Sequence, residues 1–225
     1  MTLASLVPRQ SPLLIYHHQM QDVSAFVLAG GRSSRLGKDK ALLALGDRNF
    51  LQIALANAKA VCPTPIIVGS RSLYAAYGEI IEDRMSGCGP LGGIHAALSA
   101  TMSDLNLVLS VDMPLMDSGF LKWLTNQAAE NTVAVTVPES GGRLQPLCGV
   151  YHRAILPRIE TALSTGRYKV DAVFADIPKR IISEDEMTSA GFATEIFRNV
   201  NTPEEYESLT RLSLAESASA RAAQR

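Results

Sequence analysis

Glycines and cations gather directly after the first apolar run of the chain. Residues 23–29 are almost all apolar and lead into two adjacent glycines, Gly30 and Gly31. Several cations follow within nine residues, among them Arg35, Lys38 and Lys40. Adjacent glycines let main-chain N–H groups approach a polyphosphate without a Cβ in the way, and the cations can neutralise its charge. A purely structural turn would not need so many cations, so the stretch predicts a nucleoside triphosphate site.

Asp112 is the second residue whose position indicates chemistry. It follows the apolar run 107–111 and precedes a Met-Pro pair, which favours an extended or turned exit from a strand. A carboxylate there suits Mg²⁺, which usually takes one or two protein carboxylates together with phosphate oxygens and water. Asp112 could instead cap the next helix, but Asp117 and Ser118 are closer to that helix. We therefore favour a metal ligand at Asp112, whereas Asp83, after another apolar pair, could simply make a turn.

Two better-known phosphate motifs fit this chain poorly. The Walker pattern requires a glycine where Arg32 stands and a Ser or Thr where Asp39 follows Lys38. A Gly-x-Gly-x-x-Gly pattern occurs at residues 87–92, but it is separated from the preceding apolar pair and contains Pro90, which has no N–H for a pyrophosphate. A dehydrogenase built on that pattern is the least favoured alternative.

Composition restricts the kind of protein and its partners. The chain has 225 residues, 47% of them hydrophobic and 19% charged, with a formal net charge of −1. These values predict one compact globular domain with no overall field for attracting nucleic acid, so a polyanion would be held by a local cluster. Three cysteines without paired spacing suggest neither a disulfide framework nor a zinc site. We therefore expect a cytoplasmic protein.

The two ends of the chain have the composition of unstructured segments. We expect residues 1–22 to be a disordered extension, residues 23–214 to form a single domain, and residues 215–225 to be a frayed tail. The apolar patch in the N-terminal segment is too short and wrongly flanked for a signal peptide or a membrane span. No membrane partner is therefore expected.

Apolar runs alternate with helical patterns along the central part of the chain. We expect strands at 23–29, 65–68, 107–111 and 132–137, and helices at 50–60, 91–101, 119–129 and 153–164. This order predicts a doubly wound, mostly parallel α/β sheet. Ligands of such sheets lie at the carboxyl ends of the strands, so the cations and carboxylates described above should share one rim.

The last third of the chain departs from this alternation. A glycine-rich turn at 138–143, followed by a second apolar segment at 144–151, predicts a small antiparallel excursion. Near the end, Thr202, Pro203 and Glu205 have the positions of an N-cap, a first-turn proline and an N3 glutamate. A last helix should begin there.

The stretch 28–43, LAGGRSSRLGKDKALL, resembles the signature of the molybdenum cofactor guanylyltransferase family, within the larger nucleotidyltransferase group. Further stretches resemble that family in the same order: Asp83 with 89–93, 112–114, 145–151 and 199–204. The resemblance covers residues 23 to about 209. It implies a three-layer α/β/α Rossmann-like nucleotidyltransferase fold, with a mostly parallel sheet and a small antiparallel excursion.

The resemblance also implies an activity. Members of this family use GTP and Mg²⁺ to join GMP to the terminal phosphate of molybdopterin, releasing pyrophosphate and making the guanine dinucleotide form of the cofactor. It implies GTP and molybdopterin as substrates, Mg²⁺ as cofactor, and transient contacts with cofactor assembly or client enzymes. It implies no nucleic-acid or membrane partner.

By position, the resemblance assigns roles to individual residues. The nucleotide contacts are Leu28, Ala29, Gly30, Gly31, Gly37, Lys40, Asp83 and Asp112. The catalytic residues are Arg35, Lys40 and Asp112, and Asp112 is also the metal ligand. The acceptor side comprises Gln145, Asn199 and Asn201.

One position, Gly31, bears on the choice of base, and another, Gly69, departs from the family pattern. Related cytidylyltransferases typically carry Ala where Gly31 stands, and the missing methyl group leaves room for a purine, so Gly31 favours guanine. The family can carry Asn after the strand at 65–68, where this chain has Gly69, and no nucleotide contact is assigned there.

Alternatives from other classes remain open on the sequence. A cytidylyltransferase or a sugar nucleotidyltransferase would keep the glycine-rich loop and Asp112 but use another base or acceptor. A non-catalytic protein could bind GTP without turnover, although Lys40 and Asp112 argue against loss of the catalytic groups. Selectivity among triphosphates and measured turnover separate these alternatives.

Overall fold

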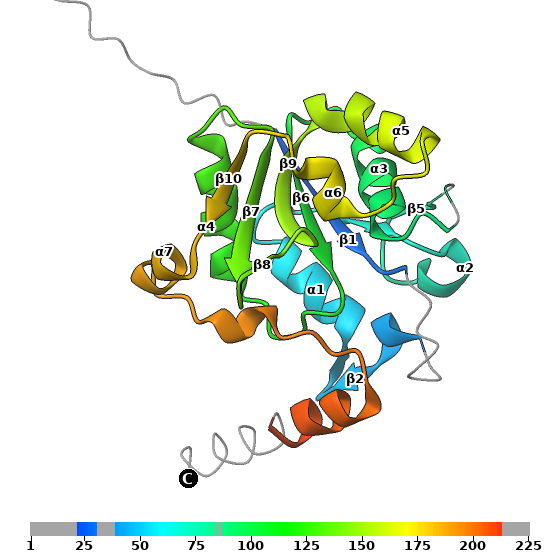
Figure 1. The fold of residues 1–225 in the computed structure, drawn as a ribbon. Helices are drawn as coiled ribbons and strands as arrows, with labels where there is room; N and C mark the ends of the chain where they lie inside the picture. Colours follow the sequence, from blue (N-terminus) through cyan, green and yellow to red (C-terminus); the bar gives the residue numbers. More distant parts are fainter. Residues whose placement is uncertain (1–21, 31–38, 84, 86, 213–225) are drawn as a thin grey trace, which may run out of the picture.

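A single sheet with helices on both faces forms the body of the molecule (Figure 1). The computed structural model describes residues 22–30, 39–83, 85 and 87–212. The strands of the sheet, in the order in which they lie, are β10 (Lys179–Ile182), β7 (Val135–Ser140), β9 (Cys148–His152), β6 (Leu105–Ser110), β1 (Val23–Leu28), β4 (Ile66–Val68) and β5 (Ile80–Ile81). The strand β8 (Arg143–Leu144) pairs with β7, and β2 (Ala44–Leu45) and β3 (Arg48–Asn49) form a separate small sheet.

The main helices are α1 (Phe50–Ala58), α2 (Arg71–Tyr74), α3 (Pro90–Ala100), α4 (Ser118–Ala129), α5 (Leu156–Ser164), α6 (Val170–Phe174) and α7 (Glu184–Ser189). Shorter 3₁₀ turns are η1 (Lys40–Leu42), η2 (Arg153–Ile155) and η3 (Thr194–Phe197). Among the described residues, no helix combines the length and apolar character needed to cross a membrane.

Most neighbouring strands run parallel. β1 pairs in parallel with both β4 and β6, β4 with β5, and β7 with β10. β9 runs antiparallel between β6 and β7, and β8 runs antiparallel to β7. The doubly wound sheet with a small antiparallel excursion is therefore confirmed.

Side chains that alternate along each strand supply two separate cores. On one face, Val27 and Leu109 belong to the cluster that includes residues of α1 and α4. On the other face, Phe26 and Val108 pack in the cluster that includes residues of α3 and α5. Successive strand residues point to opposite faces, so a fully apolar strand needs helices on both sides, which gives the three-layer architecture.

The register of the strands shows which edge of the sheet carries the expected site residues. Leu28 at the end of β1 pairs with Val68 of β4 on one side and with Ser110 of β6 on the other. The chain therefore leaves three adjacent parallel strands at one level of the sheet. Gly30, Gly69 and Asp112 follow these exits within two residues.

The hairpin after β7 is tighter than the expected turn at 138–143. β7 begins at Val135 and continues through Ser140, and the turn is reduced to Gly141 and Gly142, with φ of 60° and 67°. Two successive residues with positive φ are typical of two-residue hairpin turns whose twist matches that of the strands. Composition marked the turn, but the pairing with β8 decided its length.

The helix expected at 153–164 is present with a different start. Residues Arg153–Ile155 form a 3₁₀ turn, and α5 follows with Pro157 in its first turn. A proline lacks the N–H that an interior helical position would donate, so it is tolerated where the first turn leaves that donor unused.

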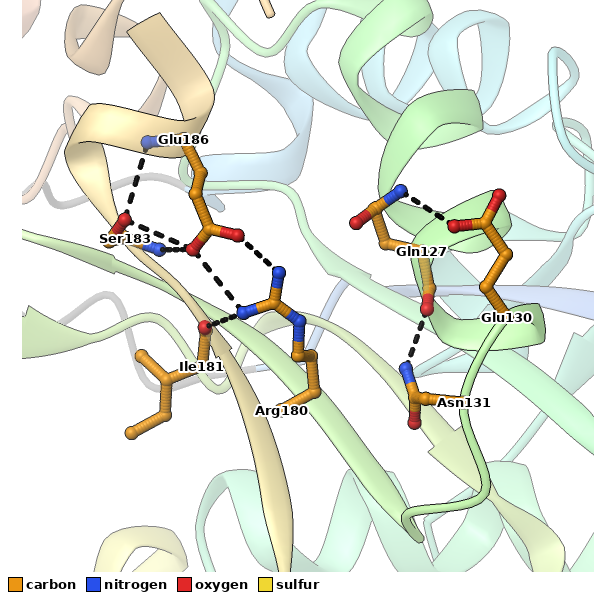
Figure 2. A network of polar contacts seen from close by, with 7 residues as sticks. All are labelled: Gln127, Glu130, Asn131, Arg180, Ile181, Ser183 and Glu186. Atoms are coloured by element: carbon orange, nitrogen blue, oxygen red, sulfur yellow. Dashed lines mark hydrogen bonds and ion pairs between the residues drawn. The ribbon is translucent and has the colours of Figure 1, made fainter. Parts of the chain in front are cut away.

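The C-terminal part contains elements that the sequence patterns did not indicate, namely α6, β10, α7 and η3. α7 begins with a capping box, in which Ser183 and Glu186 exchange side-chain to main-chain hydrogen bonds. Figure 2 shows Arg180 of β10 paired with the carboxylate of Glu186, which joins the strand to the helix. The same view contains the Gln127–Glu130 hydrogen bond at the end of α4.

The expected last helix spans residues 203–212 in the described part of the chain. The main-chain N of Glu205 donates to the Thr202 hydroxyl at 3.2 Å, and the Thr202 N donates to Glu205 Oε2 at 3.0 Å. These reciprocal bonds confirm the predicted N-cap. The expected disorder of residues 1–22 and 215–225 falls almost entirely outside the described residues, as do Gly31, Arg35, Gly37 and Lys38.

Candidate active site

A cavity of about 870 Å³ lies at the carboxyl ends of β1, β4 and β6. Its walls include Leu28, Gly30, Gly69, Asp83, Gly93 and Ser110. Apolar side chains, bare main chain and one carboxylate therefore surround it. A cavity of this size and lining can take a nucleoside-sized ligand.

Two glycines in this wall lie close to neighbouring side chains. A Cβ on Gly93 would lie 3.3 Å from both terminal methyl groups of Leu28, and a Cβ on Gly69 would lie 2.9 Å from Cε2 of Tyr74. Any side chain at Gly69 would force the Tyr74 ring to shift. The glycine found where the family can carry Asn is thus required by the packing beneath it.

Asp83 follows β5 and contributes the carboxylate of the cavity wall. Its Oδ1 accepts a hydrogen bond from the main-chain N of Met85 at 2.8 Å. Its carboxylate also rests against the first turn of α3, since a Cβ on Gly92 would lie only 2.6 Å from Oδ2. The positive end of the helix dipole stabilises a carboxylate there. Asp83 can accept hydrogen bonds from a ligand inside the cavity, as its predicted role requires.

Lys40, Asp112 and Asn201 meet at the rim although they come from three distant stretches. The Lys40 Nζ donates to Oδ1 of Asn201 at 2.7 Å and lies 3.8 Å from Oδ2 of Asp112. The Lys40 and Asp112 side chains are only 17% and 20% exposed. The geometry therefore unites a cation and a carboxylate that the sequence assigned to phosphate and metal binding.

Asp112 also anchors the C-terminal stretch. Its main-chain O accepts a hydrogen bond from the N of Val200 at 3.0 Å. Its side-chain Oδ1 and the Oδ1 of Asn199 are buried and have no hydrogen-bond partner among the described residues. Buried acceptors are nearly always paired, so these two oxygens can accept hydrogen bonds from a ligand or from water.

The Asp112 carboxylate fits Mg²⁺ in its chemistry. A hard oxygen donor with an unpaired buried atom is what that ion requires. The described residues contain no group of three or more His, Cys, Asp or Glu side chains that could hold a metal. In many Mg²⁺ sites one or two protein carboxylates are joined by substrate phosphates and water, and Asp112 offers one such carboxylate.

The remaining residues predicted to contact the nucleotide follow the end of the first strand or belong to it. Leu28 and Gly30 line the cavity, whereas Ala29 is buried and its N donates to the Val68 O at 2.9 Å. Gly31, Arg35 and Gly37 lie outside the described residues. Their predicted roles stay predictions.

Gln145 lies in the turn between β8 and β9. Its side-chain Nε2 is 3.3 Å from the Arg143 O and 3.4 Å from the Ser140 O, so it ties the hairpin together. No hydrogen bond or ion pair joins it to Lys40 or Asp112 in the described part of the chain. Leu147, two residues further on, does line the cavity. A role in acceptor binding stays a prediction.

Two further residues support the site but were not predicted from the sequence, Asp39 and Tyr74. Asp39 caps η1, its Oδ1 accepting from the Ala41 N at 2.9 Å, and its Oδ2 lies 2.6 Å from the Tyr74 hydroxyl. The position of Asp39 just before Lys40 was a usable signal for a cap. Nothing in the sequence indicates that Tyr74 contacts Asp39.

Proteins with similar sequences are known across most of the length of this chain. The family described as MobA-like NTP transferase domain matches residues 25–181. A protein of Carboxydothermus hydrogenoformans named probable molybdenum cofactor guanylyltransferase is 32% identical over 196 residues, covering 86% of this chain and 98% of the relative. The molybdenum cofactor guanylyltransferase of Desulfosudis oleivorans is 32% identical over 191 residues, covering 84% of this chain and 94% of that protein.

Solved structures share the fold. The molybdopterin-guanine dinucleotide biosynthesis protein A of Archaeoglobus fulgidus superposes with a TM-score of 0.75 at 22% identity, covering 84% of this chain and 97% of that one. A CMP-2-keto-3-deoxy-manno-octonic acid synthetase in complex with CTP gives 0.67 at 14% identity, covering 86% and 99%. The match across most of the chain, over the strands and loops that build the cavity, shows that this protein belongs to the MobA-like NTP transferase domain family.

Proposed function

We propose that this nucleotidyltransferase transfers GMP from GTP to the terminal phosphate of molybdopterin, releasing pyrophosphate and forming the guanine dinucleotide cofactor. The observation that carries the proposal is the pairing of Lys40 with Asp112, which follows β6 two residues after Ser110, a residue that lines the nucleoside-sized cavity. The names of the relatives supply the base and the acceptor.

The chemistry requires positioning rather than a strong base. The attacking group is a phosphomonoester whose second pKa of about 6 leaves it largely ionised at neutral pH. One of its oxygens attacks the α-phosphorus of GTP, and a new P–O bond forms. The bond from the α-phosphorus to the bridging oxygen breaks, and its electron pair leaves with pyrophosphate. Such transfers depend on alignment and charge neutralisation.

The residues at this edge of the sheet can supply both alignment and charge neutralisation. The Lys40 ammonium, already held near Asp112, would neutralise the phosphates, and Asp112 would hold Mg²⁺. When bound, that ion supplies Lewis-acid stabilisation of charge on the phosphate oxygens. Asp83 would hold the nucleoside in the cavity, and Arg35 would add charge near the reacting phosphates.

On the acceptor side we assign Asn199, Asn201 and Gln145. Asn199 offers an unpartnered buried oxygen, and Asn201 already touches Lys40. We further propose the cytoplasm as the compartment, which suits three cysteines that form no disulfide, together with transient contacts to cofactor assembly or client enzymes.

The test is calorimetric titration with GTP, CTP and ATP, each with and without Mg²⁺, followed by a turnover assay with molybdopterin. Selective binding of GTP and formation of the dinucleotide are expected. Preference for CTP would move the protein to the cytidylyltransferases, since the fold itself accepts CTP in a structural relative. GTP binding without turnover would indicate a nucleotide sensor.

Asp112→Asn tests the metal ligand at constant shape. A neutral amide should bind Mg²⁺ more weakly than the carboxylate does. Without the ion, negative charge on the phosphates would be poorly neutralised, so turnover should fall by about a hundredfold or more. Asp104→Asn is the matched control, since this exposed aspartate precedes β6 at the opposite end of the strand. Turnover should be unchanged in the control, and both variants should melt near the native temperature. Full activity of Asp112→Asn would remove the metal role.

A further inference from the structure

A single tyrosine hydroxyl joins the two described flanks of segment 31–38. Tyr74, the last residue of α2, is 2% exposed. Its hydroxyl lies 2.8 Å from the Ala29 O and 2.6 Å from Oδ2 of Asp39, so its one proton is shared between two acceptors. Ala29 precedes the glycine pair and Asp39 precedes Lys40, so one side chain fixes both approaches to the site.

The contact to Asp39 fixes the turn that carries Lys40. Asp39 uses Oδ1 to cap η1 through the Ala41 N at 2.9 Å, which leaves Oδ2 for Tyr74. The turn is closed by only two main-chain bonds, Leu42 N to Asp39 O and Leu43 N to Lys40 O, each 3.1 Å long. A single 3₁₀ turn has little stability of its own, so contacts from outside must decide where it lies.

Tyr74 reaches this position without being part of the cavity wall. Its ring lies under Gly69, where a Cβ would be 2.9 Å from Cε2, and so it supports the wall from behind. Burial and the neighbouring Asp39 carboxylate raise the pKa of the Tyr74 hydroxyl, so it remains a neutral donor. A neutral hydroxyl aimed at a carboxylate makes a strong, directional hydrogen bond.

We infer that Tyr74, acting through Asp39, is a positioning residue that holds Lys40 where it meets the nucleotide phosphates. This inference deepens the proposed function and rests on it. The connection runs from the Tyr74 hydroxyl to the Asp39 carboxylate, through one turn of main chain to Lys40, and from Lys40 to Asp112 at 3.8 Å.

Calorimetry of Tyr74→Phe with GTP and with guanosine separates positioning from general loosening. The variant keeps the ring and loses only the hydroxyl. Affinity for GTP should fall about tenfold, the effect of losing one charge-assisted contact, while affinity for guanosine stays within about twofold. Equal losses for both ligands would overturn the inference, because they would mean that the cavity itself had changed.

A double-mutant cycle with Lys40→Ala tests the route. If Tyr74 acts through Lys40, Tyr74→Phe should weaken GTP binding by less than about twofold once Lys40 has been removed. A further tenfold loss in that background would show that Tyr74 acts independently of Lys40 and would overturn the route.

Two substitutions at Asp39 distinguish its geometry from its charge. In Asp39→Asn the amide oxygen can still accept from the Ala41 N, and the amide N can donate to the Tyr74 oxygen. GTP affinity should therefore remain within about threefold of the native value, whereas Asp39→Ala should match Tyr74→Phe. If Asp39→Asn and Asp39→Ala weakened GTP binding equally, the charge of Asp39 rather than its hydrogen-bonding geometry would control affinity. That result would overturn the positioning role.

Tyr77→Phe is the matched control for the loss of a tyrosine hydroxyl. Tyr77 is close to Tyr74 in the chain, and its hydroxyl accepts from Nδ2 of Asn49 at 2.9 Å, away from the cavity wall. Its GTP affinity should equal that of the native protein. An equal loss in Tyr77→Phe would overturn a specific role for Tyr74.

The position of Lys40 can also be measured without any nucleotide. The Lys40 side chain is 17% exposed, so its acetylation, followed by mass spectrometry, should be slow in the native protein and severalfold faster in Tyr74→Phe. An unchanged rate would overturn the inference. This measurement does not depend on GTP or molybdopterin, so failure of the proposed function would leave it interpretable.

Discussion

At the scale of single residues, the site contains buried polar atoms that lack a hydrogen-bond partner among the described residues. Oδ1 of Asp112 and Oδ1 of Asn199 are both buried without a partner among the described residues. Leaving a buried acceptor unpaired costs about 1–3 kcal/mol, so their presence lowers stability. Such costs are characteristic of binding sites, where the partner arrives with the ligand.

Asn199→Ala should therefore affect activity more than stability. The substitution removes an oxygen that makes no hydrogen bond among the described residues. The free energy of unfolding should therefore change by no more than about 1 kcal/mol. Turnover at low molybdopterin should fall by about tenfold if Asn199 holds the acceptor. Urea unfolding and KM for molybdopterin measure the two effects. A large loss of stability with unchanged KM would contradict the acceptor role.

At the scale of elements, short segments are fixed by side chains at their ends. η1 is capped by Asp39, α1 by Asn49 with Gln52, and α7 by Ser183 with Glu186. The cap of α7 is reinforced by a cation from a neighbouring strand, Arg180 of β10 (Figure 2). The hydrogen bonds from Arg180 and then from the Ser183 main chain lower the pKa of Glu186 from 4.5 to about 2.

This shift predicts a contribution to stability that is lost in acid. A lowered carboxyl pKa stabilises the folded state above pH 4.5, and the stabilisation disappears as the pH falls toward 2. Both side chains are at least a third exposed, so solvent screening reduces the contribution to about 1 kcal/mol. Urea unfolding of the native protein and of Glu186→Gln should differ by that amount at pH 6 and converge near pH 2.

Glu130→Gln is the control for the loss of a hydrogen-bonded carboxylate. Glu130 lies in the same view and accepts a hydrogen bond from the neutral amide of Gln127 at 3.1 Å. With no cation in that contact, Glu130→Gln should lower the free energy of unfolding at pH 6 by less than Glu186→Gln does. A Glu186→Gln difference that stays constant with pH would refute the linkage.

At the scale of the whole molecule, the C-terminal third returns to complete a site begun near the N-terminus. In Figure 1 the helix at 203–212 lies beside β2, and the Tyr206 hydroxyl donates to the Ala44 O at 2.7 Å. Val200 and Leu209 pack with Leu43 and Phe50 in a small core of their own. This packing places Asn201 next to Lys40.

An aromatic cluster packs the chain before residue 200 against α4. Phe120 of α4 is fully buried and contacts Trp123, Phe192 and Phe197, with ring centroids 5.3 to 5.8 Å apart. Phe120→Ala should lower the free energy of unfolding by about 3–5 kcal/mol, since it leaves a cavity in the core. Leu73→Ala is the control, because Leu73 is 49% exposed and should cost no more than about 0.5 kcal/mol. Thermal or urea unfolding of both variants measures the difference, and a small effect at Phe120 would show that the cluster relaxes.

The sequence by itself determined the parallel sheet and indicated Lys40 and Asp112 as candidate site residues. Apolar runs, glycines and cations are local signals, and strand ends must share one edge in a parallel sheet, so Lys40 and Asp112 could be expected near one rim. Tertiary structure alone decided that Tyr74 supports Asp39, that Gly69 must lack a side chain, and that Asn201 meets Lys40. These contacts join residues far apart in the chain, and their geometry depends on the packing of the whole domain. No local pattern encodes that packing.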